Sequence, residues 1–122
     1  MSHVVRIQTQ VRDPAAIVAA CSRLALQPPE QGTFSLFSGE VTGLAVRLPD
    51  WKYSVVCRTE SGELAFDNYG GAWGEQRQLD KFLQAYAVEK AQLEARRSGH
   101  SVTEQRLTGG AIKLTIHVGG AA

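Results

Sequence analysis

The chain has 122 residues, of which 43% are hydrophobic and 20% are charged, the composition of one ordinary folded domain rather than of a disordered segment. Thirteen basic and twelve acidic residues leave a formal net charge of +1, so no overall field attracts nucleic acid or an anionic membrane. No apolar run approaches the length of about 18 residues that a membrane-spanning helix needs.

A strand followed by a helix is predicted at the start of the chain. Apolar and polar residues alternate over 4–11, which is typical of a half-buried strand. Residues 1–3 precede it without the basic and apolar regions of a signal peptide, so we expect a cytoplasmic protein. Asp13 and Pro14 provide an N-cap and a first-turn proline. They predict a helix from Pro14 to about Leu26, and Pro28-Pro29 prevents it from continuing.

Strands and turns fill the middle of the chain. The pattern predicts strands over 33–37, 41–48, 51–59 and 63–67. The turns and breaks between them are Ser38-Gly39, Pro49-Asp50 and Ser61-Gly62.

The clearest secondary-structure pattern is a long helix from Glu75 to Ser98. Its apolar residues recur at intervals of three and four from Leu79 to Leu93. Gly99 follows as a stop. The acidic residue in the first turn and the two arginines in the last turn suit the helix dipole.

The chain ends in a predicted hairpin with strands over 101–107 and 111–118 around Thr108-Gly109-Gly110. We expect residues 119–122 to be a frayed tail. The complete order is β-α-β-β-β-β-α-β-β. It predicts a single α+β domain over 1–118, with one mostly antiparallel sheet and two helices packed on one face.

The two cysteines stand apart from any CxxC or Cys/His cluster. Cys21 falls on the apolar face of the first predicted helix, and Cys57 falls on a predicted strand. We interpret them as two buried free thiols, because free cysteine behaves as a small hydrophobic residue. A disulfide between them is the alternative, and it would require a secreted context.

Common catalytic and cofactor-binding motifs are absent from the sequence. There is no P-loop, no HExxH, no GxSxG and no dinucleotide fingerprint. His3, His100 and His117 are interpreted as separate surface residues, because a metal site needs three or four ligands. We therefore expect neither a metal nor a cofactor.

The best candidate for a functional site is the segment 67–74, Asp-Asn-Tyr-Gly-Gly-Ala-Trp-Gly, which leads from a strand to the long helix. A glycine-rich turn in this position can bind an anion. The segment lacks the lysine and hydroxyl of a P-loop, however, and its glycines are more simply explained as positions of positive φ. Aromatic side chains with a polar tip suit interface positions. The candidate partner- or ligand-binding residues are Trp51, Tyr53, Asp67, Tyr69, Gly70, Gly71 and Trp73.

Two of these residues allow more than one interpretation. Asp67 is the best single candidate for acid–base chemistry, but an Asp-Asn pair is more simply a turn residue whose side chain bonds nearby backbone amides. Trp73 either belongs to an interface or closes the core between the sheet and the long helix.

Several short collinear motifs resemble one protein family. They are the V-x-I-x-T-x-V-x-D strand after residues 1–3, the segments 67–71 and 73–74, the helix motif 79–86, and the hairpin segments 99–102 and 110–114. Over nearly its whole length the chain resembles domain-of-unknown-function family twelve-fifty-seven, which includes a conserved hypothetical chloroplast reading frame of algal plastids. The resemblance implies a small soluble protein with no assigned activity. It also implies genes near a AAA-type ATPase and a second very small protein.

The first functional hypothesis is a non-enzymatic protein-interaction module or accessory subunit. Its partner would be another protein, such as a AAA-type ATPase or a small companion protein. The contact surface would be the 67–74 turn with Trp51, Tyr53 and the start of the long helix, and an open sheet edge can also accept a partner strand or a second copy.

Two other functions stay open. One is a small-ligand-binding protein or weak enzyme with a pocket under the same turn, using Asp67, Tyr69 and His100. The other is nucleic-acid binding through Arg77, Lys81, Arg96 and Arg97, which is disfavoured because acidic residues interrupt this strip.

Overall fold

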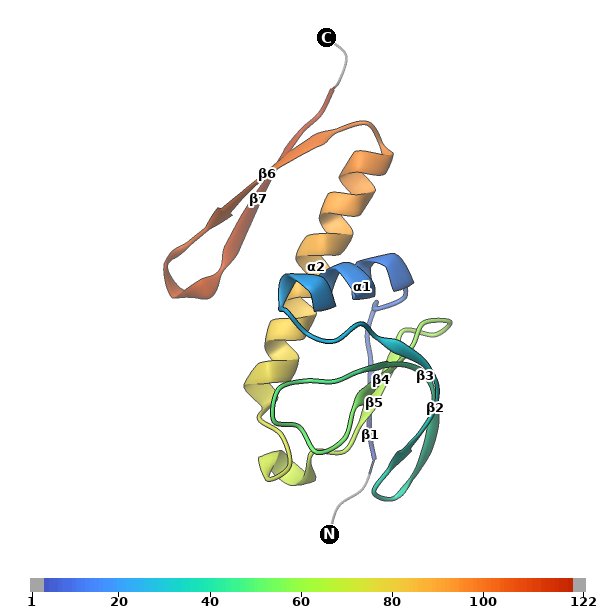
Figure 1. Cartoon of the computed structure of the whole chain (residues 1–122). Coiled ribbons are helices and arrows are strands. Elements are labelled where there is room, and N and C mark those ends of the chain that lie inside the picture. The colour runs from blue at the N-terminus through green and yellow to red at the C-terminus, as the bar shows by residue number, and fades with distance from the viewer. Residues whose placement is uncertain (1–3, 120–122) are drawn as a thin grey trace. The chain divides into compact units, whose positions relative to one another are not determined.

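The computed structural model describes residues 4–119. These residues contain two α-helices and seven strands in the predicted order, which confirms the α+β class (Figure 1). The chain divides into two compact units, Met1–Tyr86 and Ala87–Ala122, and each is described on its own. His3 and, apart from Gly119, the expected frayed tail lie outside the described residues.

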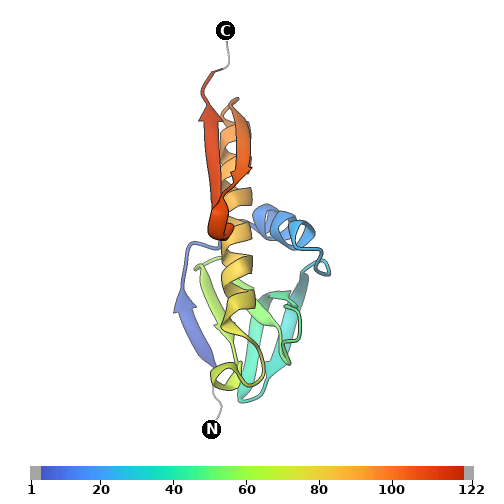
Figure 2. The same ribbon diagram turned by 90° about the vertical axis from the view of Figure 1, so that its left-hand side faces the viewer.

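The first unit is built on a five-stranded antiparallel sheet with the order β1-β5-β4-β3-β2. Figure 2 shows β1 (blue) and β2 (teal) at its two edges. The strands are β1 (Val5–Gln8), β2 (Glu30–Leu36), β3 (Gly39–Val46), β4 (Val55–Arg58) and β5 (Glu63–Phe66).

The central strand β4 and its neighbour β5 are buried on both faces of the sheet. Val56 lies opposite Ala65 and Cys57 lies opposite Leu64, and all four are fully buried. Val56 and Ala65 belong to a cluster with residues of β2 and β3. Such apolar runs are typical of strands that are covered on both sides.

The cysteines are two buried free thiols, as predicted. Burial and, as the smaller cause, the nearby Cys21 together raise the pKa of Cys57 to about 12. Burial also raises the pKa of Cys21. Both thiols therefore stay protonated at neutral pH.

The first helix, α1 (Pro14–Arg23), begins as predicted but ends earlier. The Asp13 side chain accepts a hydrogen bond from the Ala15 amide at 3.0 Å, which is an N-cap. Ala25 then adopts a φ of 56°, and the Leu26 amide donates to the Cys21 carbonyl at 2.8 Å. This left-handed C-terminal cap ends the helix before Pro28-Pro29 can do so.

The strand predicted over 51–59 is also shorter than expected, because residues 51–54 form a loop. Asp50 has a φ of 62°, which bends the chain. The Lys52 amide donates to the Trp73 carbonyl at 2.8 Å. The backbone of this stretch is thus bonded to the 67–74 turn instead of to a neighbouring strand.

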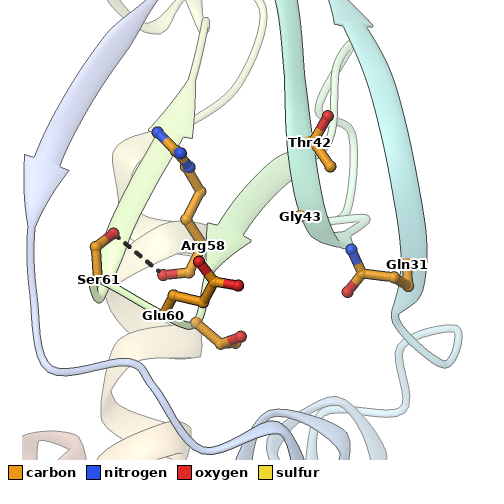
Figure 3. Close-up of a pocket in the computed structure, with 7 residues that line it drawn as sticks. Gln31, Thr42, Gly43, Arg58, Glu60 and Ser61 are labelled. Carbon is orange, nitrogen blue, oxygen red and sulfur yellow. Dashed lines mark hydrogen bonds between the residues drawn. The ribbon is translucent and has the colours of Figure 1, made fainter.

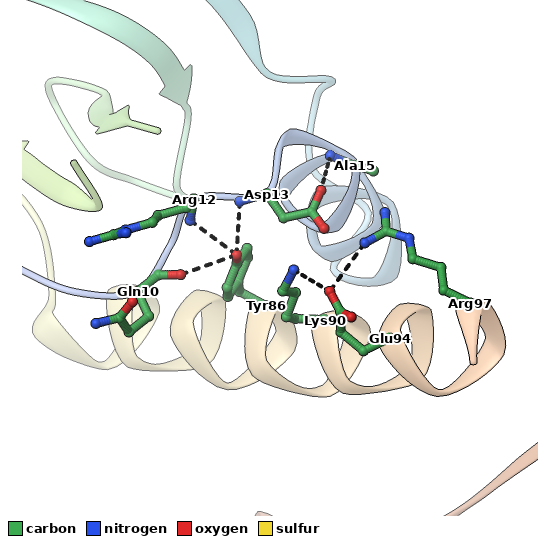
Figure 4. Close-up of polar contacts among 8 residues, drawn as sticks. All are labelled: Gln10, Arg12, Asp13, Ala15, Tyr86, Lys90, Glu94 and Arg97. Carbon is green, nitrogen blue, oxygen red and sulfur yellow. Dashed lines mark hydrogen bonds and ion pairs between the residues drawn. The ribbon is translucent and has the colours of Figure 1, made fainter. Parts of the chain in front are cut away.

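The long helix α2 (Gln76–Arg97) is fixed to the β1–α1 connection by one hydroxyl group (Figure 4). Tyr86 Oη accepts hydrogen bonds from the amides of Arg12 and Asp13 at 3.1 and 3.0 Å, and it donates to the Gln10 carbonyl at 3.3 Å. One buried tyrosine therefore satisfies three backbone groups of the connection.

The second unit contains β6 (Ser101–Arg106) and β7 (Ile112–His117), which form a separate two-stranded sheet rather than an extension of the first. Its predicted turn is confirmed, since Gly109 and Gly110 have φ values of 87° and 91°. Gln92 Nε2 of α2 donates to Glu104 Oε1 at 2.7 Å. Glu94 Oε1 accepts from Lys90 and Arg97 on the same helix (Figure 4).

Among residues 4–119, none of the helices combines the length and the apolar character needed to cross a bilayer.

Candidate functional site

The 67–74 turn is held in one conformation by its own hydrogen bonds. The Asn68 carbonyl accepts from the amides of Gly71 and Trp73 at 3.0 and 2.9 Å. The buried Asn68 side chain donates to the Gly74 carbonyl at 3.1 Å. A short 3₁₀ turn, η1 (Tyr69–Gly71), lies inside this loop. The turn is therefore a closed, preorganised structure.

Positive φ angles at three consecutive residues shape this turn. They are 49° at Tyr69, 61° at Gly70 and 105° at Gly71, so the predicted role of the two glycines is confirmed. Tyr69 is different, because a side chain in the left-handed region costs roughly 1–2 kcal/mol. The strained residue, Tyr69, also contributes its ring to an exposed aromatic cluster.

An aromatic cluster is centred on Trp73. The Tyr69 ring stacks on it with 4.7 Å between ring centroids and an interplanar angle of 23°. The rings of Phe37 and Tyr53 lie 5.3 and 5.8 Å from it. Phe37 is 60% exposed and Tyr69 is 44% exposed. Part of the aromatic surface around the turn is therefore exposed to solvent and does not pack into the core.

Lys52 adds a charge to this cluster. Its Nζ lies 4.4 Å from the Trp73 ring centroid and 5.6 Å from that of Tyr53, which are cation–π distances. We name the set Phe37, Lys52, Tyr53, Tyr69 and Trp73 the Trp73 surface. The sequence prediction omitted Phe37 and Lys52. Two features of the sequence could have indicated them: Phe37 is an apolar residue at a predicted hairpin tip, and Lys52 lies between two aromatic residues.

Trp51, in contrast, lies beneath the surface and is only 6% exposed. Its indole Nε1 donates to the Glu75 carbonyl at 3.1 Å, and its ring meets Phe66 edge to face. A Cβ added to Gly74 would lie 2.4 Å from the Trp51 ring. Trp51 therefore supports the turn from within, which removes it from the predicted contact surface.

Asp67 is also buried, with 1% of its surface exposed. Its Oδ1 accepts a hydrogen bond from the Tyr69 amide at 3.3 Å, which is the turn role that an Asp-Asn pair predicts. Its Oδ2 has no hydrogen-bond partner among residues 4–119. A buried side-chain oxygen without a partner is rare in proteins, so Oδ2 is a second unusual feature of the turn, beside the positive φ of Tyr69.

A polar hollow of about 400 Å³ lies at one end of β4 (Figure 3). Arg58, Glu60 and Ser61 line one side, opposite residues of β2 and β3. Arg58 Nη1 is already paired with Glu63 Oε1 at 3.2 Å. Arg6 contacts the same Glu63 oxygen at 3.2 Å, and no residue of 67–74 lines this hollow. It is therefore not the pocket predicted under the turn.

The other predicted groups lie elsewhere. His100 and His117 belong to the second unit, where they bond to the Gly119 amide and the Thr103 hydroxyl. Arg77 pairs with Glu75, and Arg97 pairs with Glu94. Over the described part of the chain, no group of three or more His, Cys, Asp or Glu residues is arranged to hold a metal ion.

Comparisons with protein-family models, with curated proteins and with solved structures give no significant match.

Proposed function

We propose that this protein is a non-enzymatic protein-interaction module and that the Trp73 surface is its contact site. The observation that carries the proposal is the gathering of Phe37, Tyr53 and Tyr69 around Trp73, with Phe37 and Tyr69 both exposed to solvent. Tryptophan and tyrosine are the residue types that most often dominate the binding free energy of protein interfaces.

The rigidity of the turn supports this proposal. Three hydrogen bonds to and from Asn68 hold the backbone beneath the rings, and Trp73 is tied to Lys52 through its carbonyl. A partner that binds this surface would not have to order the loop first. Preorganisation of this kind raises affinity because less conformational entropy is lost on binding.

The partner that the family resemblance suggests is a AAA-type ATPase or a small companion protein. Lys52 gives the surface a positive charge, which favours a partner with a carboxylate beside an apolar side chain. The two buried free thiols fit the expected cytoplasmic location, where cysteines stay reduced.

The test is affinity purification of the tagged full chain from its own cells, followed by measurement of Kd with each purified, stoichiometric partner. We expect Trp73→Ala and Phe37→Ser to weaken binding by about tenfold or more, which is the effect of losing an interface hot spot. Val18→Ser is the matched control, because Val18 is an exposed apolar residue of α1 outside this surface. Folded variants that bind as tightly as the wild type would refute the proposal.

A second candidate function rests on Asp67. Its buried Oδ2, without a partner among the described residues, favours a small ligand that donates a hydrogen bond or carries a positive charge. A screen of amines and other small donors by thermal shift tests this function. The expected result is a ligand-dependent rise in Tm that Asp67→Asn abolishes and Glu60→Gln retains. A rise that Asp67→Asn retains would exclude Asp67 as the ligand contact.

A further inference from the structure

A smaller hollow of the first unit, of about 270 Å³, shares no residue with the Trp73 surface. It is lined by Leu24, Leu26, Leu48, Pro49, Gln78 and Lys81. Most of this lining is hydrocarbon, and the two remaining residues come from the first turns of α2. The hollow therefore combines apolar walls with a polar helix face.

The walls are set by two residues with unusual backbone angles. Ala25, between Leu24 and Leu26, has a φ of 56°, and Asp50, after Pro49, has a φ of 62°. Leu26 is held by the hydrogen bond from its amide to the Cys21 carbonyl. Left-handed angles at residues other than glycine are costly and are found preferentially at functional sites. In this protein two of them lie beside the lining residues of one hollow.

Lys81 is the charged residue of this hollow. Lys81 makes no ion pair with any residue of the described chain, whereas the nearest acidic residues in sequence are engaged elsewhere. Asp80 Oδ1 accepts a hydrogen bond from Gln76 Nε2 at 3.1 Å, and Glu75 pairs with Arg77. Gln78 lies one helical turn before Lys81, so the two residues share a face of α2.

We propose that this hollow binds a small apolar carboxylate, with its hydrocarbon part against the three leucines and its carboxylate at Lys81 and Gln78. The apolar walls select hydrocarbon, and the unpaired ammonium group selects a negative charge. At about 30 Å³ for each water-sized group, the hollow holds about nine such groups. A straight-chain acid of about seven or eight carbons, which has about nine or ten non-hydrogen atoms, matches this number. This binding activity is separate from the proposed protein-interaction function.

The first experiment is a titration of the full-length, isotope-labelled protein with octanoate, followed by amide NMR. We expect saturable shifts at Leu24, Leu26, Leu48, Gln78 and Lys81. In a series from butanoate to octanoate, Kd should fall about fourfold for each added methylene, the factor that corresponds to burial of one such group. Shifts that do not saturate, or that fall elsewhere on the protein, would overturn the proposal.

The second experiment distinguishes recognition of the carboxylate charge from nonspecific hydrophobic binding of the chain. Octanoate should bind about two- to fivefold more tightly than 1-octanol, which is the upper part of the range for one exposed ion pair. Lys81→Gln should remove this difference, whereas Arg77→Gln, on the same helix but outside the hollow, should retain it. Equal binding of the acid and the alcohol to the wild type would refute a carboxylate site.

The third experiment replaces an apolar residue that lines the hollow. Leu26→Ser should weaken octanoate binding, and Val18→Ser should leave it unchanged because Val18 does not line the hollow. Circular dichroism and Tm establish that each variant is folded. Unchanged binding by a folded Leu26→Ser protein would contradict the assignment, as would equal weakening by both variants.

Discussion

The two units of the chain use β-strands in different ways. In the first unit, β4 and β5 are inner strands of a five-stranded sheet, and Val56, Cys57, Leu64 and Ala65 are fully buried. In the second unit, no residue of β6 or β7 is buried, and Ile116 is 46% exposed. The first sheet is therefore specified by packing, whereas the ribbon of β6 and β7 is specified by its turn and its cross-strand pairs.

This difference shows where the stability of the molecule resides. Burial of apolar surface contributes about 25 cal/mol per Å², so the core of the first unit dominates. A two-stranded hairpin is only marginally stable in water without further packing. Substitutions should consequently be costly in the first unit and tolerated in the ribbon. The following predictions test that contrast, beginning with the largest expected effect.

Phe82→Ala should cost about 3–5 kcal/mol of unfolding free energy, because it leaves a cavity where a fully buried ring was. Urea unfolding followed by circular dichroism measures this loss. A cost below about 1 kcal/mol would mean that the core of the first unit does not control stability, and the contrast between the units would fail.

Gly74→Ala should cost about 3 kcal/mol, since the new Cβ would lie 2.4 Å from the Trp51 ring. The same unfolding measurement applies. Gly39→Ala is the control, because a Cβ at Gly39 meets no atom within 4 Å. Similar losses for both variants would show that the effect arises from glycine replacement in general and not from the contact with Trp51.

Tyr86→Phe should cost about 1–2 kcal/mol, because the amides of Arg12 and Asp13 lose their common acceptor. Tyr53→Phe should change stability by less than about 0.5 kcal/mol, since no described residue bonds to that hydroxyl. The comparison of the two variants by thermal unfolding isolates the hydrogen bonds of Tyr86. Equal effects would contradict their importance.

Stability should fall at alkaline pH because of the buried thiols. The pKa of Cys57 is raised from 9.0 to about 12 in the folded state, so its contribution is complete below pH 9 and is lost as the pH rises from 9 towards 12. One thiol gives a slope of about 1.4 kcal/mol per pH unit. This slope is measured by denaturant unfolding of the wild type and of Cys57→Ala between pH 8 and 11. Identical pH slopes would show that Cys57 does not titrate with unfolding.

Ile116→Ala in the ribbon should have the smallest effect, below about 1 kcal/mol, since it mainly removes a cross-strand contact with Val102. Unfolding by urea, with Phe82→Ala measured in parallel, gives the ratio between the two units. A loss comparable to that of Phe82→Ala would show that Ile116 is covered in solution, and sedimentation would then reveal whether a second copy covers it.

The elements that sequence patterns predicted well are those whose signals are local. The N-cap at Asp13, the turn glycines at 109 and 110 and the apolar repeat of α2 each act through nearby residues. The early end of α1 was missed because Ala25 adopts a left-handed angle that its side chain does not favour. The loop at 51–54 was missed because its backbone partner, Trp73, is distant in sequence.

The candidate site was predicted only in part, because some of its contacts join residues that are distant in sequence. The residues Tyr53, Tyr69 and Trp73 are brought together, but Trp51 lies beneath them. Alternation along a strand predicts which face a side chain takes, and Trp51 lies in a loop where that rule does not apply. Phe37 joins the cluster through the β2–β3 turn, a contact that depends on tertiary structure.

The close approach of Gly74 to Trp51 has a consequence for how this turn can evolve. A side chain at position 74 and an indole at position 51 exclude each other sterically, so a side chain is accepted at 74 only after the indole at 51 has been replaced by a smaller residue. Among homologues, an indole at position 51 should occur with glycine at 74, and larger residues at 74 should occur with smaller residues at 51. The two positions should therefore covary beneath the aromatic surface.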